Sequence, residues 1–271
     1  MNAATPDQPH LPSRAASPQG ARLTAGVVII GNEVLSAKVH DANTPTILAK
    51  FSAAGIRVLE VAVLPDVVER IAEVIRAFSA RFDLVVTTGG VGPTHDDCTW
   101  KAVALALNRP LVLHLPLIAR IEARAGQPLS PEQKRLALLP EGTEMLGADG
   151  RWPTLRLENI YVLPGVPSLV VGRVDHICAL FCRPPAHLAT VDFACDEWNA
   201  LCQIDAVVAS YADLEIGSYP IYGDRAHRLR LTFEGEDLSR VQSAVHSVSQ
   251  SIGVTRLIAV VWRKSEQDQD Q

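Results

Sequence analysis

Blocks of apolar residues alternate with segments of helical periodicity over most of this chain. An apolar run at residues 25–30 is followed by a helical pattern at 43–54 and by a second apolar run at 56–63. Strand, helix and strand in this order are typical of a βαβ unit. Because the runs are apolar at nearly every position, we expect strands that are covered on both faces, as in a parallel sheet.

The same alternation continues to about Phe181. The predicted elements are, in chain order, a helix after Asp66, a strand at 83–88, a helix at 98–107, a helical segment at 116–138 interrupted near 126–131, a strand at 159–163 and a final helix. Together with the first βαβ unit they predict an α/β domain with a mostly parallel sheet over residues 23–183.

Pro184 and Pro185 mark a predicted domain boundary, because each proline fixes its own φ and disfavours helix in the residue before it. Beyond them the pattern predicts a strand at 187–194, a helix at 196–210, strands at 214–218 and 228–233, and a helix at 238–251. This order indicates a small α+β domain over residues 186–262. The outer segments, a disordered leader at 1–22 and a flexible tail at 263–271, are expected to remain outside both domains.

A glycine-rich segment follows the predicted strand at 83–88 and leads into the next helix. It reads Gly89-Gly90-Val91-Gly92-Pro93-Thr94-His95-Asp96-Asp97. In open α/β sheets ligands bind beyond the carboxyl ends of the strands, and glycines let backbone N–H groups approach an anion closely. We therefore expect the amides from Gly89 to Thr94 to hold a phosphate. The segment matches neither a Walker A loop nor the dinucleotide GxGxxG fingerprint.

Acidic side chains accompany this loop. Asp96 and Asp97 supply hard oxygen donors next to the predicted phosphate site, an arrangement that recruits a divalent cation. Either residue could instead cap the helix that follows. Glu33 and Asp41 lie in the loop after the first strand, at the same edge of the sheet. Asp41 also suits a helix cap, and Glu33 also suits a solvated loop position.

Three spaced motifs together resemble a known family. They are Ile30-Gly31-Asn32-Glu33-Val34-Leu35 with Asp41-Ala42-Asn43, the segment 89–97, and Leu163-Pro164-Gly165-Val166-Pro167. This combination is similar to the molybdopterin-binding-like (MoCF) domain, most closely to the N-terminal domain of the competence/damage-inducible protein A (CinA) family and to the corresponding domain of eukaryotic FAD synthase. The likeness continues through Ile216-Gly217-Ser218-Tyr219-Pro220 and Leu229-Arg230-Leu231-Thr232-Phe233, and so spans about residues 23–252.

The resemblance implies a three-layer α/β/α fold and, for the CinA-like and FAD synthase branches, a metal-dependent pyrophosphatase that splits FAD or ADP-ribose and releases AMP. The implied metal is Mg²⁺, Mn²⁺ or Co²⁺, assisted by K⁺. A second branch comprises molybdopterin adenylyltransferases and molybdenum insertases, in which the glycine loop holds the pterin or its AMP adduct. Residues 253–271 leave no room for an adenylyl-transferring or deamidase domain, so we expect neither of those activities.

The implied pyrophosphatase gives each candidate residue a role. The predicted catalytic residues are Asp96, Asp97, Asp41 and Glu33, of which Asp96 and Asp97 hold the metal and the other two orient water or complete the metal shell. The predicted substrate-binding residues are Gly89, Gly90, Gly92, Thr94, His95, Thr99, Gly165 and Tyr219. His95 could serve as an acid or be a merely polar loop residue. Tyr219 could stack on a flavin or adenine, or could pack between the two domains.

Two positions depart from the family pattern. Ala37 stands where the family usually has glycine, and Ser168-Leu169 stand where a glutamate usually follows the Pro-Gly-x-Pro turn. Without that glutamate, the site could bind molybdopterin or a nucleotide and deliver it without hydrolysis, as a module of molybdenum cofactor biosynthesis. A scaffold whose site has decayed is the third alternative.

Charge and composition indicate which classes of partner this chain can bind. The chain has 25 Lys and Arg against 30 Asp and Glu, a net charge of -5, and only 5% aromatic residues, which disfavours nucleic acid and anionic membranes as partners. Its five cysteines form no CxxC pair, and no apolar run reaches the roughly 18 residues of a membrane helix. We therefore expect a cytoplasmic protein that binds a small-molecule nucleotide or pterin and that could form a homo-oligomer through a sheet edge.

Overall fold

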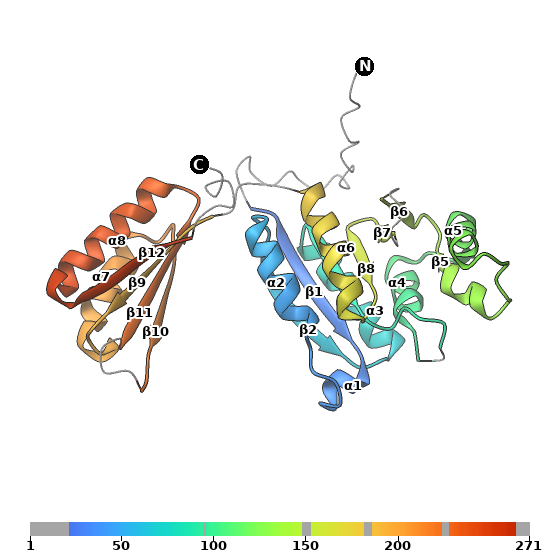
Figure 1. Cartoon of the computed structure of the whole chain (residues 1–271), viewed down its shortest axis with the longest axis horizontal. Coiled ribbons are helices and arrows are strands. Elements are labelled where there is room, and N and C mark those ends of the chain that lie inside the picture. The colour runs from blue at the N-terminus through green and yellow to red at the C-terminus, as the bar shows by residue number, and fades with distance from the viewer. Residues whose placement is uncertain (1–21, 95, 148–152, 182–185, 224–227, 264–271) are drawn as a thin grey trace, which may run out of the picture. The chain divides into compact units, whose positions relative to one another are not determined.

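The computed structural model describes residues 22–94, 96–147, 153–181, 186–223 and 228–263. They form two compact units, and the division along the chain lies between Arg183 and Pro184 (Figure 1). The expected leader, apart from Arg22, and the Pro184-Pro185 break lie outside the described residues. Among the described helices, none combines the length and the apolar composition that crossing a bilayer requires.

The first unit is built on a sheet whose described residues form six strands in the order β2-β1-β3-β8-β7-β6. The first four strands run parallel, while β7 and β6 are antiparallel to their neighbours. The strands are β1 (Thr24–Ile30), β2 (Arg57–Leu64), β3 (Leu84–Thr88), β6 (Glu144–Leu146), β7 (Thr154–Leu157) and β8 (Ile160–Leu163). Every residue of β3 and β8 is buried, as their apolar runs predict.

Helices cover both faces of this sheet (Figure 1). On one face α2 (Asn43–Ala53) packs against α6 (Pro167–Leu180), and on the other α3 (Val68–Arg81) packs against α4 (Thr99–Leu107). Each face has its own apolar cluster. The predicted three-layer α/β/α architecture with a mostly parallel sheet is confirmed. A short helix, α1 (Asn32–Leu35), follows β1.

Two segments of the first unit differ from the prediction. The helical segment expected at 116–138 is α5 (Leu115–Ala125), which ends at Gly126 with φ of 70°, followed by a 3₁₀ turn at Gln133–Ala137. Around it β4 (Leu111–Leu113) and β5 (Leu138–Pro140) pair antiparallel. The strand predicted at 159–163 is β8, but its hairpin partner β7 was not predicted. The missed strands β4, β5 and β7 have three or four residues, which is too short for a periodic pattern to be recognised.

The second unit is a small α+β fold, as predicted. Its described strands form an antiparallel sheet in the order β10-β11-β9-β12. Its elements are β9 (His187–Phe193), a 3₁₀ turn at Glu197–Ala200, α7 (Leu201–Ser210), β10 (Glu215–Pro220), β11 (Leu229–Gly235), α8 (Leu238–Ile252), a 3₁₀ turn at Val254–Arg256 and β12 (Leu257–Trp262). The prediction missed β12, an edge strand in which no residue is buried.

Candidate functional site

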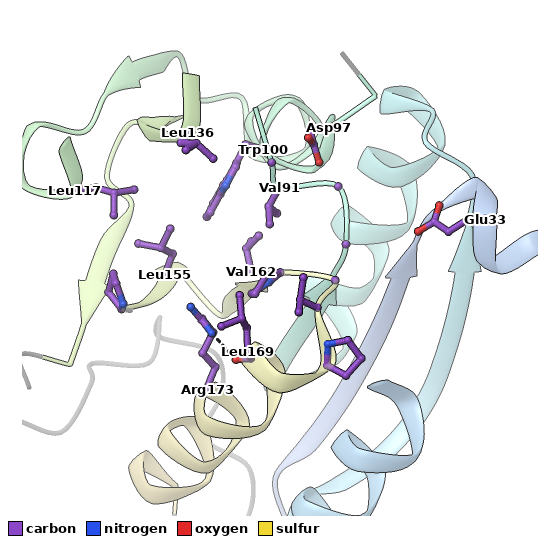
Figure 2. Close-up of a pocket in the computed structure, with 18 residues that line it drawn as sticks. Glu33, Val91, Asp97, Trp100, Leu117, Leu136, Leu155, Val162, Leu169 and Arg173 are labelled. Carbon is purple, nitrogen blue, oxygen red and sulfur yellow. Dashed lines mark hydrogen bonds between the residues drawn. The ribbon is translucent and has the colours of Figure 1, made fainter. Parts of the chain in front are cut away.

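A cavity of about 610 Å³ lies at the carboxyl ends of β3 and β8. The two strands are parallel neighbours with Thr88 opposite Leu163, so the loops that follow them meet at the same edge of the sheet. One side of the cavity is formed by residues 89–92 with Glu33 and Asp97 (Figure 2). The other side is apolar and includes Trp100, Leu117, Leu136, Leu155 and Leu169. A cavity of this size and character suits a small-molecule ligand.

The glycines at the start of the loop are required by its backbone and by its neighbours. Gly89 and Gly90 have φ of 102° and 63°, conformations that residues with a side chain rarely adopt. A Cβ at Gly89 would lie 2.0 Å from the carbonyl oxygen of Ile30, and one at Gly90 would lie 2.6 Å from Thr99 Oγ1. Only glycine therefore lets the loop pass between the end of β1 and the start of α4.

The backbone amides of the loop fall into two sets. The Gly89 N–H donates to the carbonyl of Leu163 at 3.2 Å, which continues the sheet. The Thr94 N–H donates to Asp97 Oδ2 at 2.9 Å. The amides of residues 90–92 have no hydrogen-bond partner in the described part of the chain. The predicted phosphate cradle is thus smaller than expected, with three amides available to a ligand.

Asp97 and Glu33 approach this cradle from different elements (Figure 2). Asp97 Oδ2 accepts hydrogen bonds from both the amide and the hydroxyl of Thr94, at 2.9 and 2.5 Å, and its Oδ1 has no partner among the described residues. The exposed Glu33 points toward the loop from α1. Asp96 is exposed and is not among the described residues that line the cavity.

Two predicted site residues have structural roles instead. Asp41 Oδ1 accepts from the backbone N–H groups of Asn43 and Thr44 at 3.0 Å each, and its Oδ2 accepts from the Thr44 hydroxyl at 2.5 Å. Asp41 therefore caps α2, and both its oxygens are engaged. The hydroxyl of Thr99, a predicted substrate-binding residue, is buried and donates to the carbonyl of Gly89 at 2.7 Å, so it is engaged within the protein.

Two further predicted substrate-binding residues, His95 and Tyr219, are not among the described residues that line the cavity. His95 lies outside the described residues. Tyr219 lies on β10 of the second unit, where its side chain is 54% exposed and its ring lies against Gly217. Both remain predictions.

A buried polar network fixes the turn after β8, which carries Gly165. The side-chain Nδ2 of Asn43 donates to the carbonyl of Gly165 at 2.8 Å and to Thr88 Oγ1 at 3.1 Å. The hydroxyl of Thr88 in turn donates to the carbonyl of Pro164 at 2.8 Å. A Cβ on Gly165 would lie 3.4 Å from the Cα of Gly89. The network therefore holds the predicted ligand residue Gly165 directly beside the glycine loop.

Arg173 lines the cavity and was not predicted from the sequence. It lies on α6 with a 5% exposed side chain, on the same buried face as Val170, Val174 and Ile177. Burial lowers the pKa of its guanidinium from the ordinary value. In the sequence, Arg173 can be recognised as a charged residue on a helix face that otherwise carries apolar side chains.

Comparison with known families identifies the domains. The model of the family described as "Probable molybdopterin binding domain" matches residues 26–183. The chain belongs to this molybdopterin-binding (MoCF) family. A second family model, "FAD synthase, middle domain", matches residues 185–260, which lie in the second unit.

Relatives of this MoCF protein carry several names. A protein of Archaeoglobus fulgidus is 31% identical over 231 residues, covering 85% of this chain and 98% of that protein. A Caenorhabditis briggsae protein named "Probable FAD synthase" is 27% identical over 255 residues, covering 83% of this chain and 49% of that protein, so this chain spans about half its length. The crystal structure of CinA from Thermoplasma acidophilum, called a protein of unknown function, matches with a TM-score of 0.53 at 27% identity, over 58% of this chain and 96% of that one.

The metal ion that the MoCF resemblance implies can be tested against the donors present. The described residues contain no group of three or more His, Cys, Asp or Glu side chains that could form a complete metal site. Mg²⁺, however, is commonly held by one or two carboxylates together with substrate phosphates and water. The uncommitted Oδ1 of Asp97, with Asp96 beside it in the chain, fits a metal ion that binds together with a diphosphate.

Proposed function

We propose that the cavity binds a nucleotide diphosphate such as FAD or ADP-ribose and that the protein hydrolyses it to release AMP. The observation that carries this proposal is that three backbone amides on the cavity wall, those of residues 90–92, have no hydrogen-bond partner among the described residues. Amides presented beyond the carboxyl end of a parallel strand form an anion site without a basic side chain. The name of the FAD synthase relative supports the same class of ligand.

In this reaction water adds to one phosphorus, the P–O–P bond breaks, and two phosphate monoesters leave. The amides of residues 90–92 donate to a phosphate oxygen and stabilise the charge that develops on it. Asp97, assisted by Asp96, would hold the divalent ion, which would neutralise charge on the diphosphate. Glu33 accepts a hydrogen bond from the attacking water and orients it. The apolar wall around Trp100 excludes other water from the ligand.

The test is the release of AMP from FAD and from ADP-ribose in the presence of Mg²⁺, Mn²⁺ or Co²⁺ and K⁺, measured by chromatography. We expect Asp97→Ala to lower the rate by roughly a hundredfold, because it removes the metal-binding oxygen. Asp205→Ala is the matched control, since Asp205 is an exposed aspartate on α7 of the second unit. Wild-type activity no higher than that of Asp97→Ala would overturn the hydrolytic proposal.

A second candidate function, binding without hydrolysis, is favoured by two observations. Leu169, one of the two residues that stand where a glutamate is usual, presents an apolar side chain to the cavity, and Asp41 is engaged in capping α2. Isothermal titration calorimetry separates the two candidates. Submicromolar binding of FAD or a pterin without AMP release would favour a module that holds and delivers its ligand.

A further inference from the structure

The guanidinium of Arg173 is buried without a full set of partners. Its Nη1 donates to the carbonyl of Leu169 one turn earlier in α6. Its Nη2 is buried and has no hydrogen-bond partner within the described residues. A buried N–H group that makes no hydrogen bond destabilises the fold, and more so when it belongs to a charged group. The unsatisfied Nη2 of Arg173 therefore either destabilises the core or donates a hydrogen bond to a bound ligand.

Among the described residues, no carboxylate forms an ion pair with the Arg173 guanidinium. Asp175, on the same helix, is bound by Lys50. Asp97 accepts from Thr94 on the glycine-loop side of the cavity. Figure 2 shows the guanidinium pointing from α6 into the cavity beside Leu155 and Leu169. A molecule inside the cavity would supply the acceptor for Nη2 that the described residues do not.

The walls indicate the shape and chemistry of that molecule. The cavity that Arg173 lines also has apolar side chains, among them Trp100, Leu155 and Val162, which suit a flat, fused ring. A guanidinium only donates hydrogen bonds, so it selects an edge that carries acceptors. Flavin and pterin rings both present a ring carbonyl beside a ring nitrogen. Adenine presents an amino donor in place of the carbonyl, the difference by which arginine distinguishes guanine from adenine.

We propose that Arg173 determines the specificity of the cavity by donating from Nη2 to a ring carbonyl oxygen, so that a carbonyl-bearing fused ring, a flavin or a pterin, is accepted and adenine is not. This inference rests on the proposed function, because the phosphate attached to that ring is then held by the glycine loop. It assigns the apolar half of the cavity to the flavin or pterin end of the ligand and leaves the adenine end outside.

The test uses ligands without phosphate, so that the glycine loop does not contribute. Riboflavin, neopterin and adenosine are titrated into the full chain by calorimetry. Riboflavin or neopterin should bind at least roughly tenfold more tightly than adenosine, the difference expected for one hydrogen bond to a charged donor. The tighter of the two identifies the ring as flavin or pterin. In Arg173→Met this preference should vanish, and in Arg173→Lys, which keeps the cation without the planar fork, it should fall.

Arg76→Met is the matched control, because Arg76 also donates to backbone carbonyls, those of Leu105 and Ala106, and does not line the cavity. It should leave the preference unchanged. An unchanged preference in both Arg173 variants, or wild-type adenosine binding as tight as that of the other two, would overturn the inference. If FAD is still cleaved in that case, the proposed function is retained and only the inference about Arg173 is refuted. If riboflavin or neopterin binding depends on Arg173 but no AMP is released, the inference is retained and hydrolysis is refuted.

Discussion

Asn43 donates a hydrogen bond of 2.8 Å from its side-chain amide to the carbonyl of Gly165, 122 residues away in the sequence. The same amide reaches Thr88 at the end of β3, so the first turn of α2 is joined to the ends of two strands. Asn43 is buried, and its Oδ1 has no partner among the described residues. This one side chain therefore holds together the loops that form the cavity.

Substitution of Asn43 should destabilise the first unit. In Asn43→Ala the carbonyl of Gly165 and the buried Oγ1 of Thr88 both lose their donor, and we expect the free energy of unfolding to fall by about 2 kcal/mol. Denaturation in guanidinium chloride measures this change. Thr46→Ala is the control on the same helix, because its hydroxyl donates to the carbonyl of Ala42 in an exposed hydrogen bond. Equal losses in the two variants would contradict the role given to Asn43.

Ala37 is expected to be a strained position that glycine relieves. Its φ is 55°, in the left-handed region where a Cβ is unfavourable. Ala37→Gly should therefore raise the free energy of unfolding by about 1 kcal/mol. Ala53→Gly, at the end of α2, should lower it by a similar amount, about 1 kcal/mol, because glycine disfavours helix. Destabilisation by both changes would show that Ala37 is not left-handed in solution.

Gly92 provides a test of the position of Asp97 that does not strain the backbone. A Cβ at Gly92 would lie 2.5 Å from Asp97 Oδ2 at the end of a flexible side chain, so Gly92→Ala should displace the carboxylate. We expect AMP release to fall by roughly tenfold to a hundredfold with little change in melting temperature. Gly172→Ala on α6, where a Cβ would meet no atom within 4 Å, should keep the wild-type rate. Equal rates in the two variants would argue against a role for Asp97.

Acid should weaken the second unit through Asp237. Hydrogen bonds from Ser239, and the other amides at the start of α8, lower the pKa of this capping carboxylate. Because the folded-state pKa lies below the unfolded value of roughly 3.9, its stabilising effect is complete above that pH and is lost as the pH falls through the folded value. Asp237→Asn, which can still cap, should show a shallower decline in unfolding free energy below about pH 4. An identical decline in both proteins would refute this contribution.

Much of the fold could be predicted from the sequence because its strands are buried on both faces. The fully buried runs of β3 and β8 and the amphipathic pattern of α3 leave little choice of element or of face. The short hairpin strand β7 and the edge strand β12 could not be recognised, because pairing with a neighbour rather than local pattern makes them strands.

The position of the candidate site could be predicted from the sequence, but the role of each side chain in it could not. The glycine loop comes directly after the apolar run that predicts β3, and a loop at the carboxyl end of a parallel strand lies at the sheet edge where ligands bind. Which carboxylates remain free depends on hydrogen bonds that the sequence allows in more than one way: Asp41 suits a cap as well as a catalytic role, and only the structure shows both its oxygens engaged. Arg173 reaches the cavity because of the orientation of α6, which the sequence does not specify.

A crystal structure of the protein with bound FAD or ADP-ribose and a divalent ion tests the central claim most directly. It should show a phosphate oxygen within about 2.7–3.2 Å of an amide nitrogen in residues 90–92, with the metal ion between Asp97 and the diphosphate. A diphosphate bound elsewhere on the chain, with these three amides still free of ligand, would contradict the account.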